Sequence, residues 1–253
     1  MNKVIIRKVE EVIGKIQRMS LLQDQGYTSE VHQVITEKGS YVLKSSYELK
    51  YREWLEKEAV VLEKLNTNAE IPTPSYYGYF EGENSSHLIM SYEQGMTLTN
   101  ALKKAEKHEQ LAFIKSFGQF LHRFHETSVV GFQNHDWLAQ QLKKAESYVE
   151  LGQADGDFAL LEKLLMNQPS SIKQTMIHGD CTTDNVMVIN GEVRLFIDVA
   201  GMTIGDPRYD ESLAIRKWID HEEYLEAFYK GYRRYKVTKE EFEYFNEGLY
   251  EFF

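Results

Sequence analysis

The stretch that decides the fold is MIHGDCTTDNVMVINGEVRLFIDVAG, residues 176–201. His178, Asp180 and Asn185 form the pattern H-x-D-x-x-x-x-N, and Asp198 follows later in the same stretch. One carboxylate can receive a proton, while an amide and a second carboxylate offer the oxygen ligands that Mg²⁺ prefers. The stretch therefore predicts a site that combines a metal ion with a proton acceptor.

A hairpin is expected to bring these side chains together. Two apolar runs, residues 186–189 and 192–197, flank an Asn-Gly pair, which is the strongest short-range hairpin signal. Asp198 follows the second run, so a tight hairpin would place it beside Asn185. We expect this pair to hold Mg²⁺ between a nucleotide and Asp180.

Composition limits the class of protein. The chain has 253 residues, 42% of them hydrophobic and 27% charged, which is typical of a globular protein of one or two lobes. No apolar run reaches the length of a membrane span, and charges interrupt the start too often for a secretory signal. The single cysteine, Cys181, excludes an internal disulfide and is expected to be a packing residue. We therefore expect a cytoplasmic protein without a membrane partner.

The charge balance limits the partners. The formal net charge is −10, whereas nucleic-acid binding needs clustered lysines and arginines. We therefore expect no nucleic-acid partner. A cationic small molecule is compatible with the charge, and ordinary solubility explains it equally well.

The first part of the chain is expected to be a lobe rich in strands. Residues 1–17 suggest a short amphipathic helix, and five strands with one further helix, residues 49–65, follow before residue 93. The segment Gly26-Tyr27-Thr28-Ser29 lies at the tip of the first hairpin. Its backbone N–H groups and hydroxyls could bind phosphate, but an ordinary turn would have the same sequence pattern.

Lys44 ends a strand of the V-A-I-K type, from which a lysine can reach nucleotide phosphates. An exposed lysine at a strand end is the alternative. Glu58 in the following helix is expected to pair with Lys44. Glu53 and Glu56 remain competitors because the sequence does not fix the rotation of the helix.

The rest of the chain is expected to be mostly helical. Gly95 marks a hinge, so we predict a lobe of residues 1–93 and a second lobe of residues 94–253. Residues 209–218, 222–235 and 239–253 read as the closing helices. His122 and His125 could bind a metal, but two histidines without further ligands are more often structural.

The order of these parts resembles the kinase-like fold, and the chain looks like the aminoglycoside phosphotransferase family. The resemblance runs from about Gly26 to the C-terminus and is carried mostly by HGDCTTDN followed by FIDVAGMTIGDPRYDESLA. The ending LYEFF is also similar to phosphotransferases that act on kanamycin-type aminoglycosides. The resemblance implies an α+β, bilobal protein-kinase-like fold: a five-stranded antiparallel N-lobe with one helix, and a mostly helical C-lobe.

The resemblance also implies the roles of the main site residues. Asp180 would accept the proton of the acceptor hydroxyl, and Asn185 and Asp198 would hold Mg²⁺ at the phosphates. Lys44, oriented by Glu58, would bind the α- and β-phosphates of ATP, with GTP also possible. The other expected residues are Thr28 and Ser29 near the phosphates, Ser91, Tyr92 and Glu93 at the adenine, and His178, Asp206 and Asp210 as supports of the catalytic loop.

Departures from related kinases favour a small acceptor. Protein kinases place a lysine two residues after the catalytic aspartate, where this chain has Thr182. The chain also lacks a G-x-G-x-x-G loop and an A-P-E motif. Kanamycin-type enzymes carry Gly-Arg where this chain has Ala200 and Gly201. The last departure weakens the assignment of the acceptor but leaves the fold unaffected.

The acceptor site is expected in the second lobe. Glu240, Glu243, Glu247 and Glu251 fall on one side of the predicted helix 239–253. A solvated acidic face would look the same. The residues expected to bind a polyamine sugar are Glu247, Glu251 and Phe253 at the C-terminus, and Asp155 and Asp157 in the loop before them.

The sequence thus predicts an ATP- and Mg²⁺-dependent kinase of a small molecule, with an aminoglycoside hydroxyl as the leading acceptor, as in antibiotic resistance. Choline-like compounds, sugars and amino alcohols are the alternative acceptors. A catalytically silent kinase-like binding module would be expected to lack one of Lys44, Asp180, Asn185 and Asp198, and all four are present. The sequence leaves a monomer and a homodimer equally open.

Overall fold

The computed structural model describes the whole chain except residues 1, 24, 67–70, 129–131 and 133–135. The chain divides into two compact units: unit 1 comprises Met1–Gln94 with Phe196–Ala200, and unit 2 comprises Gly95–Leu195 with Gly201–Phe253. The first break lies next to the hinge expected at Gly95. Assignment of Phe196–Ala200 to unit 1 was not foreseen.

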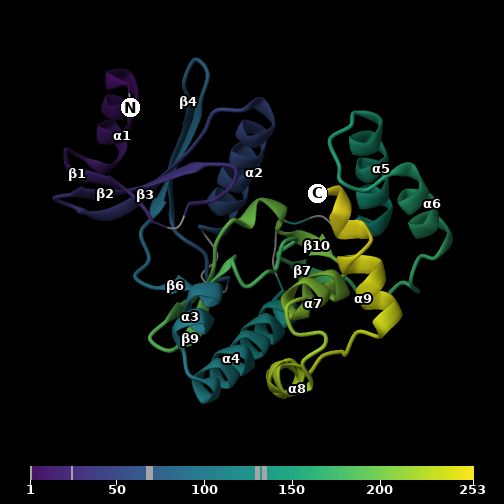
Figure 1. Cartoon of the computed structure of the whole chain (residues 1–253). Helices are drawn as coiled ribbons and strands as arrows, with labels where there is room; N and C mark the ends of the chain where they lie inside the picture. The colour runs from purple at the N-terminus through teal and green to yellow at the C-terminus, as the bar shows by residue number, and fades with distance from the viewer. Residues whose placement is uncertain (1, 24, 67–70, 129–131, 133–135) are drawn as a thin grey trace. The chain divides into compact units, whose positions relative to one another are not determined.

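Unit 1 is built on one antiparallel sheet. Its elements are α1 (Lys3–Ile13), β1 (Ile16–Leu21), β2 (Glu30–Thr36), β3 (Gly39–Ser46), α2 (Leu49–Leu65), β4 (Tyr76–Glu81) and β5 (Ser86–Ser91). The strands lie in the order β1-β2-β3-β5-β4, and every neighbouring pair is antiparallel (Figure 1). This confirms the predicted five-stranded antiparallel sheet.

The two helices of unit 1 cover opposite faces of this sheet. Leu43 of β3 belongs to a core cluster with Val9 and Ile13 of α1. The next residue, Lys44, bonds Glu58 of α2. Because successive side chains of a strand point to opposite faces, α1 and α2 lie on different sides of β3. Lys44 is thereby held on the face that α2 covers.

Unit 2 is mostly helical. Its elements, with those that cross the unit boundary, are β6 (Met96–Thr97), α3 (Leu98–Lys104), α4 (Lys107–Glu126), α5 (Trp137–Glu150), α6 (Phe158–Met166), β7 (Thr175–Ile177), β8 (Val186–Ile189), β9 (Glu192–Phe196), η1 (Val199–Gly201), β10 (Thr203–Gly205), α7 (Pro207–Ile215), α8 (Glu222–Gly231), α9 (Lys239–Asn246) and η2 (Leu249–Phe252). The strands form two small sheets, β6-β8-β9 and β10-β7 (Figure 1).

The hairpin predicted in the central stretch is present. Asn190 and Gly191 join β8 to β9 with φ values of 51° and 81°. Positive φ at both central residues is the signature of a type I′ turn, whose twist matches that of paired strands. The Asn-Gly pair therefore sets the register of the hairpin.

Two predicted helices are too long. The helix expected at residues 222–235 ends at Gly231, and the last one is broken, with α9 ending at Asn246 and a 3₁₀ turn following. At the break, a Cβ on Gly248 would lie 2.5 Å from the carbonyl oxygen of Tyr244 and 2.7 Å from a methyl group of Leu164. Only glycine fits this close approach, so the acidic stripe does not continue along one helix face.

The core of unit 2 joins the broken C-terminus to α5, α6 and α7. Leu249 and Phe252 are buried with residues of those helices, among them Trp137, Leu161 and Tyr209. Burial of large side chains such as these contributes about 1.5–3 kcal/mol each. The C-terminal turn is therefore an anchored part of the unit.

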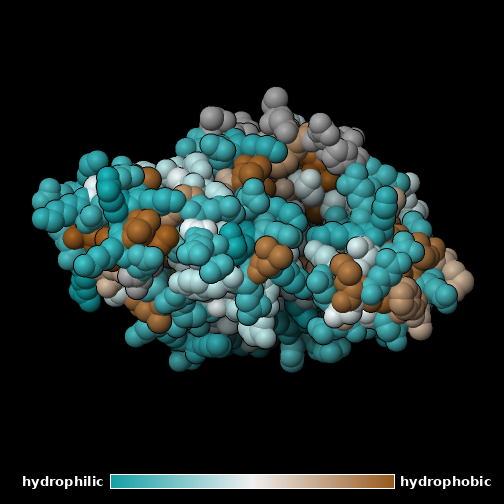
Figure 2. Space-filling model, turned by 90° about the horizontal axis from the view of Figure 1, so that it is seen from above, coloured by the Kyte–Doolittle hydropathy of each residue, from teal (hydrophilic) through white to brown (hydrophobic). Residues whose placement is uncertain are grey.

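The face of the molecule shown in Figure 2 is mainly polar. In the view of Figure 2, hydrophilic residues cover most of the face, and apolar residues are scattered among them. Within the described residues, none of the helices has both the length and the apolar character needed to cross a membrane.

Candidate active site

Lys44 and two carboxylates form the polar centre of unit 1. The Nζ of Lys44 donates to Oε2 of Glu58 and to Oδ1 of Asp198, both at 2.7 Å. Lys44 and Glu58 are 8% and 2% exposed, whereas Glu53 and Glu56 lie on the exposed side of α2. The structure therefore selects Glu58 among the three candidate partners of Lys44.

The two carboxylates of this centre stabilise the positive charge of Lys44. Burial alone would lower the pKa of Lys44, but the carboxylates of Asp198 and Glu58 outweigh it and raise that pKa. Lys44 therefore stays protonated over the physiological range. Removing either carboxylate would leave a buried cation with a single partner, which is a costly arrangement.

Asp198 has an unusual backbone conformation. Its φ is 59°, in the left-handed region that costs a non-glycine residue about 1 kcal/mol or more. Its side chain is 44% exposed although it bonds Lys44. A strained residue that presents a carboxylate to solvent beside a buried lysine is a candidate metal ligand.

The loop expected to bind phosphate lies between β1 and β2. The hydroxyl of Ser29 is buried and lies 2.6 Å from that of Ser46 on β3, so Ser29 faces the sheet. The carbonyl oxygen of Thr28 accepts the Ser46 hydroxyl at 3.2 Å. Ser29 thus ties the loop to β3. Phosphate binding by this loop remains a prediction, and the backbone N–H groups of the loop are the main candidate donors.

The segment expected at the adenine already uses two of its N–H groups. The N–H of Ser91 donates to Ser75 and that of Tyr92 to Ser40, and the Ser91 hydroxyl donates to the Glu93 carboxylate. If this segment binds an adenine edge, Glu93 is the residue of the three to supply the backbone donor.

In unit 2, the side chain of Asn185 holds the predicted base. Its Nδ2 donates to the carbonyl oxygen of Asp180 at 2.9 Å and to Oδ2 of the same residue at 2.7 Å. The hydroxyl of Tyr250 donates to the other carboxylate oxygen, Oδ1, at 3.1 Å. The carboxylate of Asp180 is therefore fixed from two sides. The pairing with Asn185 joins two residues of the predicted motif, and the contact with Tyr250 is new.

Asp210 holds the loop that carries Asp180 through the backbone of that loop. It is fully buried, and its two oxygens accept the N–H groups of His178 at 2.6 Å and Gly179 at 2.9 Å. His125 lies 3.3 Å from the same carboxylate and 2.9 Å from the hydroxyl of Tyr232. Burial lowers the pKa of His125 although Asp210 opposes this, so a neutral ring donates to Asp210 and accepts from Tyr232.

His178 and Gly179 fix the turn before Asp180. The Nδ1 of His178 accepts the N–H of Asp180 at 3.2 Å, and the ring is fully buried. Gly179 has a φ of 82°, and a Cβ there would lie 2.5 Å from the carbonyl oxygen of Gly201. His178 therefore holds the turn before Asp180 through this hydrogen bond.

The oxygen donors available fit Mg²⁺. Because Nδ2 of Asn185 donates to Asp180, the amide oxygen is the atom left for a cation, and Asp198 offers an exposed carboxylate. Within the described part of the chain no group of three or more His, Cys, Asp or Glu residues could hold a metal.

Comparison with known proteins identifies the family of this chain. The sequence profile of the phosphotransferase enzyme family (APH) matches residues 22–244. The chain belongs to this family. No curated protein sequence matches it. Among solved structures, an aminoglycoside-3′-phosphotransferase of type VIII is 20% identical, covers 93% of each chain and has a TM-score of 0.76.

Two other similar structures hold ligands. A mutant of the aminoglycoside phosphotransferase APH(4)-Ia, bound to ADP and hygromycin B, is 18% identical, covers 89% of this chain and 80% of its own, and has a TM-score of 0.67. Spectinomycin phosphotransferase APH(9)-Ia, bound to ADP and spectinomycin, is 18% identical with coverages of 97% and 83% and a TM-score of 0.63. At these identities they establish the kinase-like fold, and the family assignment makes the chain a phosphotransferase.

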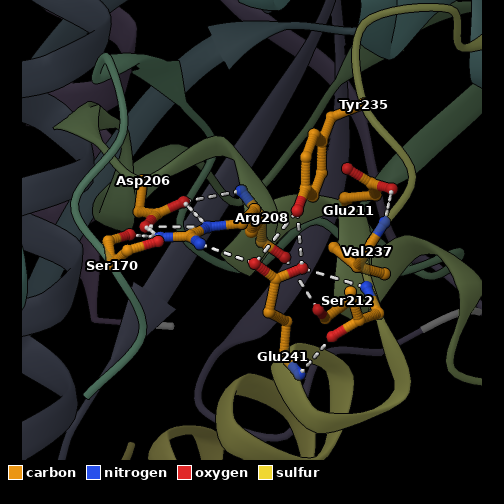
Figure 3. A network of polar contacts seen from close by, with 9 residues as sticks. Ser170, Asp206, Arg208, Glu211, Ser212, Tyr235, Val237 and Glu241 are labelled. Atoms are coloured by element: carbon orange, nitrogen blue, oxygen red, sulfur yellow. Dashed lines mark hydrogen bonds and ion pairs between the residues drawn. The ribbon is translucent and has the colours of Figure 1, made fainter.

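In this phosphotransferase, Asp206 does not act like Asp210. Asp206 caps α7 by accepting the N–H of Arg208, and it also binds the Arg208 guanidinium at 2.6–3.2 Å (Figure 3). Arg208 further donates to Glu241 and to the carbonyl oxygen of Ser170. Asp206 therefore caps backbone N–H groups, as expected, but its carboxylate binds Arg208 rather than the catalytic loop.

The residues expected to bind the acceptor do not form the arrangement that the sequence predicted. Asp157 caps α6 by accepting the N–H of Leu160 at 2.8 Å. Glu247 and Glu251 are both exposed, but the break at Gly248 separates them. The expected single acidic face is therefore wrong, because α9 ends before Glu247.

The loop and the C-terminus are nevertheless joined. The N–H of Gly156 donates to the carbonyl oxygen of Glu251 at 2.9 Å. Asp155 is exposed in this loop. The ring of Phe253 faces the ammonium of Lys144, whose Nζ lies 4.8 Å from the ring centroid. Acceptor binding by these residues remains a prediction.

Cys181, next to Asp180 in the phosphotransferase motif, is fully buried. Burial raises the pKa of its thiol well above the usual value, and the charges of Asp210 and Asp180 add to this. A protonated buried thiol is inert, which agrees with the expected packing role.

Sequence reasoning missed Tyr250 and Arg216 of the phosphotransferase. The guanidinium of Arg216 lies 4.8 Å from the ring centroid of Tyr250, whose hydroxyl bonds Asp180. The only available signal was the position of Tyr250 within LYEFF. A tyrosine in a short motif does not by itself indicate contact with a base far away in sequence.

Proposed function

We propose that this protein transfers the γ-phosphate of ATP to a hydroxyl group of a small molecule and uses Mg²⁺ to do so. The observation that carries the proposal is the fixed carboxylate of Asp180, held by Asn185 on one oxygen and accompanied by a hydroxyl donor on the other. A general base needs this kind of orientation toward an alcohol. Membership of the phosphotransferase enzyme family supports the reaction type.

The residues of unit 1 would bind the nucleotide. Lys44, kept charged by Glu58 and Asp198, would bind the α- and β-phosphates. Glu58 would hold the Lys44 ammonium in an orientation that directs a further N–H toward phosphate. The ADP molecules in two similar structures support a nucleotide here. Phosphoryl transfer depends mostly on such positioning and on charge neutralisation.

The residues of unit 2 would bind and activate the acceptor. Asp180 would orient the acceptor hydroxyl and take its proton as the oxygen attacks phosphorus. Asp210 and His178 would keep the loop in place through its backbone N–H groups. Asn185 and Asp198 would hold Mg²⁺, which would neutralise charge on the phosphate oxygens.

An aminoglycoside-like compound is the leading acceptor. The similar structures named above contain hygromycin B and spectinomycin, and this chain carries a net charge of −10. Exposed carboxylates at Asp155, Glu247 and Glu251 would suit ammonium groups.

A different small alcohol is the second candidate, for a specific reason. Two cations lie on aromatic rings of the C-terminal turn: Lys144 on Phe253 and Arg216 on Tyr250. Positive charge there would oppose a polycationic acceptor and would tolerate a sugar or an amino alcohol with fewer charges. A catalytically silent binding module is a third candidate, but the sequence retains all four of Lys44, Asp180, Asn185 and Asp198.

A screen for ADP release tests the proposal. Purified protein with MgATP would be offered aminoglycosides, sugars, choline-like compounds and amino alcohols, and Asp180→Asn would serve as the inactive control. We expect at least one acceptor to stimulate ADP release by the wild type and not by the variant. Nucleotide binding with no stimulation by any acceptor would favour the silent module.

A further inference from the structure

Tyr250 lies on the carboxylate that the proposed function assigns as the base. Its hydroxyl donates to Oδ1 of Asp180 at 3.1 Å, and Asn185 occupies Oδ2. Nothing in the predicted motif calls for a phenol at this position. Tyr250 brings an O–H donor to the oxygen of Asp180 that the side chain of Asn185 does not bond.

The turn that carries Tyr250 is fixed. Leu249 and Phe252, on either side of it, are 0% and 1% exposed. The carbonyl oxygen of Glu251 accepts the N–H of Gly156. A Cβ at Gly156 would lie 2.7 Å from the ring of Phe252, so the loop and the turn fit closely. The backbone of Tyr250 is therefore held in place, so displacement of the phenol from Asp180 would require a change of its side-chain rotamer.

The phenol is held as a hydrogen-bond donor. Burial raises the pKa of Tyr250 above its ordinary value, and the charge of Asp180 adds to this, while the nearby charge of Arg216 opposes the rise without reversing it. The Arg216 guanidinium lies against the ring, 4.8 Å from its centroid. Tyr250 is thus a protonated alcohol, fixed within hydrogen-bond distance of the base.

An acceptor hydroxyl has the same requirements. It must donate to the base across about 2.6–3.2 Å before its oxygen attacks phosphorus. A water molecule at that position would meet the same requirement and would hydrolyse ATP. We propose that Tyr250 holds the acceptor position on Asp180 while no acceptor is bound, and that it thereby keeps water off the base and limits futile ATP hydrolysis.

The reaction that Tyr250 would suppress is the hydrolysis of ATP by water. The oxygen of water forms a bond to the γ-phosphorus, the bond from this phosphorus to the β–γ bridging oxygen breaks, and Asp180 takes one proton from the water. ADP and inorganic phosphate are the products. In productive turnover an acceptor hydroxyl replaces the phenol on Oδ1, so Tyr250 is a positioning residue. This inference rests on the proposed role of Asp180.

The test measures ADP release from MgATP alone, without any acceptor, per nucleotide-binding site. Tyr250→Phe removes the hydroxyl and keeps the ring, so we expect hydrolysis to rise by about tenfold, the scale of one hydrogen bond to a charged group. The matched control is Tyr244→Phe. Tyr244 is a neighbouring buried tyrosine whose hydroxyl donates to Leu164 at 3.3 Å, and its variant should hydrolyse ATP like the wild type.

A gain of hydrolysis cannot come from partial unfolding, which lowers every activity. The double variant Asp180→Asn/Tyr250→Phe should lose the gain, because water then lacks the base. If Tyr250→Phe does not fold, Tyr250→Leu replaces it with the same expected gain.

Hydrolysis by a folded Tyr250 variant at or below the wild-type rate overturns the inference. That outcome differs from failure of the proposed function, in which the wild type phosphorylates no acceptor and Asp180→Asn changes nothing.

Discussion

The carboxylate of Asp210 accepts the backbone N–H of His178 at 2.6 Å and supports the loop that carries Asp180. Its other oxygen accepts the N–H of Gly179, and neutral His125 donates to the oxygen that also accepts His178. The orientation of the proposed base thus depends on a buried carboxylate of α7 rather than on the loop alone.

Asp210→Asn should therefore affect both activity and stability. An amide offers one acceptor where the carboxylate offers two, so one buried N–H loses its partner. We expect the free energy of unfolding to fall by about 2–4 kcal/mol and kcat by about 10²-fold. Urea unfolding and steady-state kinetics measure the two effects. Asp220→Asn, at an exposed aspartate after α7, should match the wild type in both. Equal behaviour of the two variants would contradict the role of Asp210.

Glu58→Gln should weaken the use of ATP. The buried ammonium of Lys44 would keep Asp198 as its only carboxylate partner, and its position would shift. We expect kcat/KM for ATP to fall by about 10²-fold. The exposed residues Glu53 and Glu56 of the same helix provide matched controls, and their glutamine variants should lie within twofold of the wild type. A loss of similar size in a control would show that the charge of α2, rather than the contact, matters.

Much of the fold and part of the site follow from local sequence. The Asn-Gly turn and the strand that carries Lys44 are short-range signals, and the structure contains both, although that strand continues to Ser46. The break at Gly248 was missed because helical periodicity continues through it. The glycine is required by a close approach to Leu164, which sequence does not reveal.

The other errors have the same origin. Arg208 claims the carboxylate of Asp206, and Tyr250 reaches Asp180 from the far end of the chain. Both contacts depend on tertiary structure and on no local pattern. Sequence therefore predicted the residues of the motif better than the residues that surround it.

Two glycines separate backbone strain from steric conflict. Gly179 and Gly191 have nearly equal φ values of 82° and 81°, but a Cβ on Gly191 would meet no atom within 4 Å. Gly191→Ala should therefore cost only the conformational term, about 1–2 kcal/mol. Gly179→Ala should cost more and abolish turnover, because its Cβ would collide with Gly201. Urea unfolding of both variants provides the comparison, and equal costs would contradict the tight packing at Gly179.

Glu211 should make stability depend on pH. Burial raises its pKa to about 8, and the charges of Glu241 and Asp206 add to the rise. The N–H of Val237 (Figure 3) and the hydroxyl of Tyr229 donate to Glu211 and oppose the rise. The folded state therefore keeps a proton that the unfolded state releases near pH 4.5. The resulting stabilisation is complete below that pH and is lost as the pH rises toward 8.

Glu211→Gln should remove this dependence. Between pH 5 and pH 8 the wild type should lose roughly 2–5 kcal/mol relative to the variant. Urea unfolding at several pH values checks the sign. A wild type that gains stability over the variant with rising pH would show that Glu211 is buried as a charged group.

The central claim is that Asp180 is the base of a phosphoryl transfer to an alcohol. The most direct measurement is mass spectrometry of an acceptor found in the screen, after incubation with MgATP and either the wild type or Asp180→Asn. Asp184→Asn is the control within the same loop, because its carboxylate is exposed and pairs with Lys217. We expect the acceptor to gain one phosphoryl group with the wild type and the control. The rate should fall about 10²–10⁴-fold in Asp180→Asn, with ADP binding unchanged. Phosphorylation of the acceptor by Asp180→Asn at the wild-type rate would contradict the account.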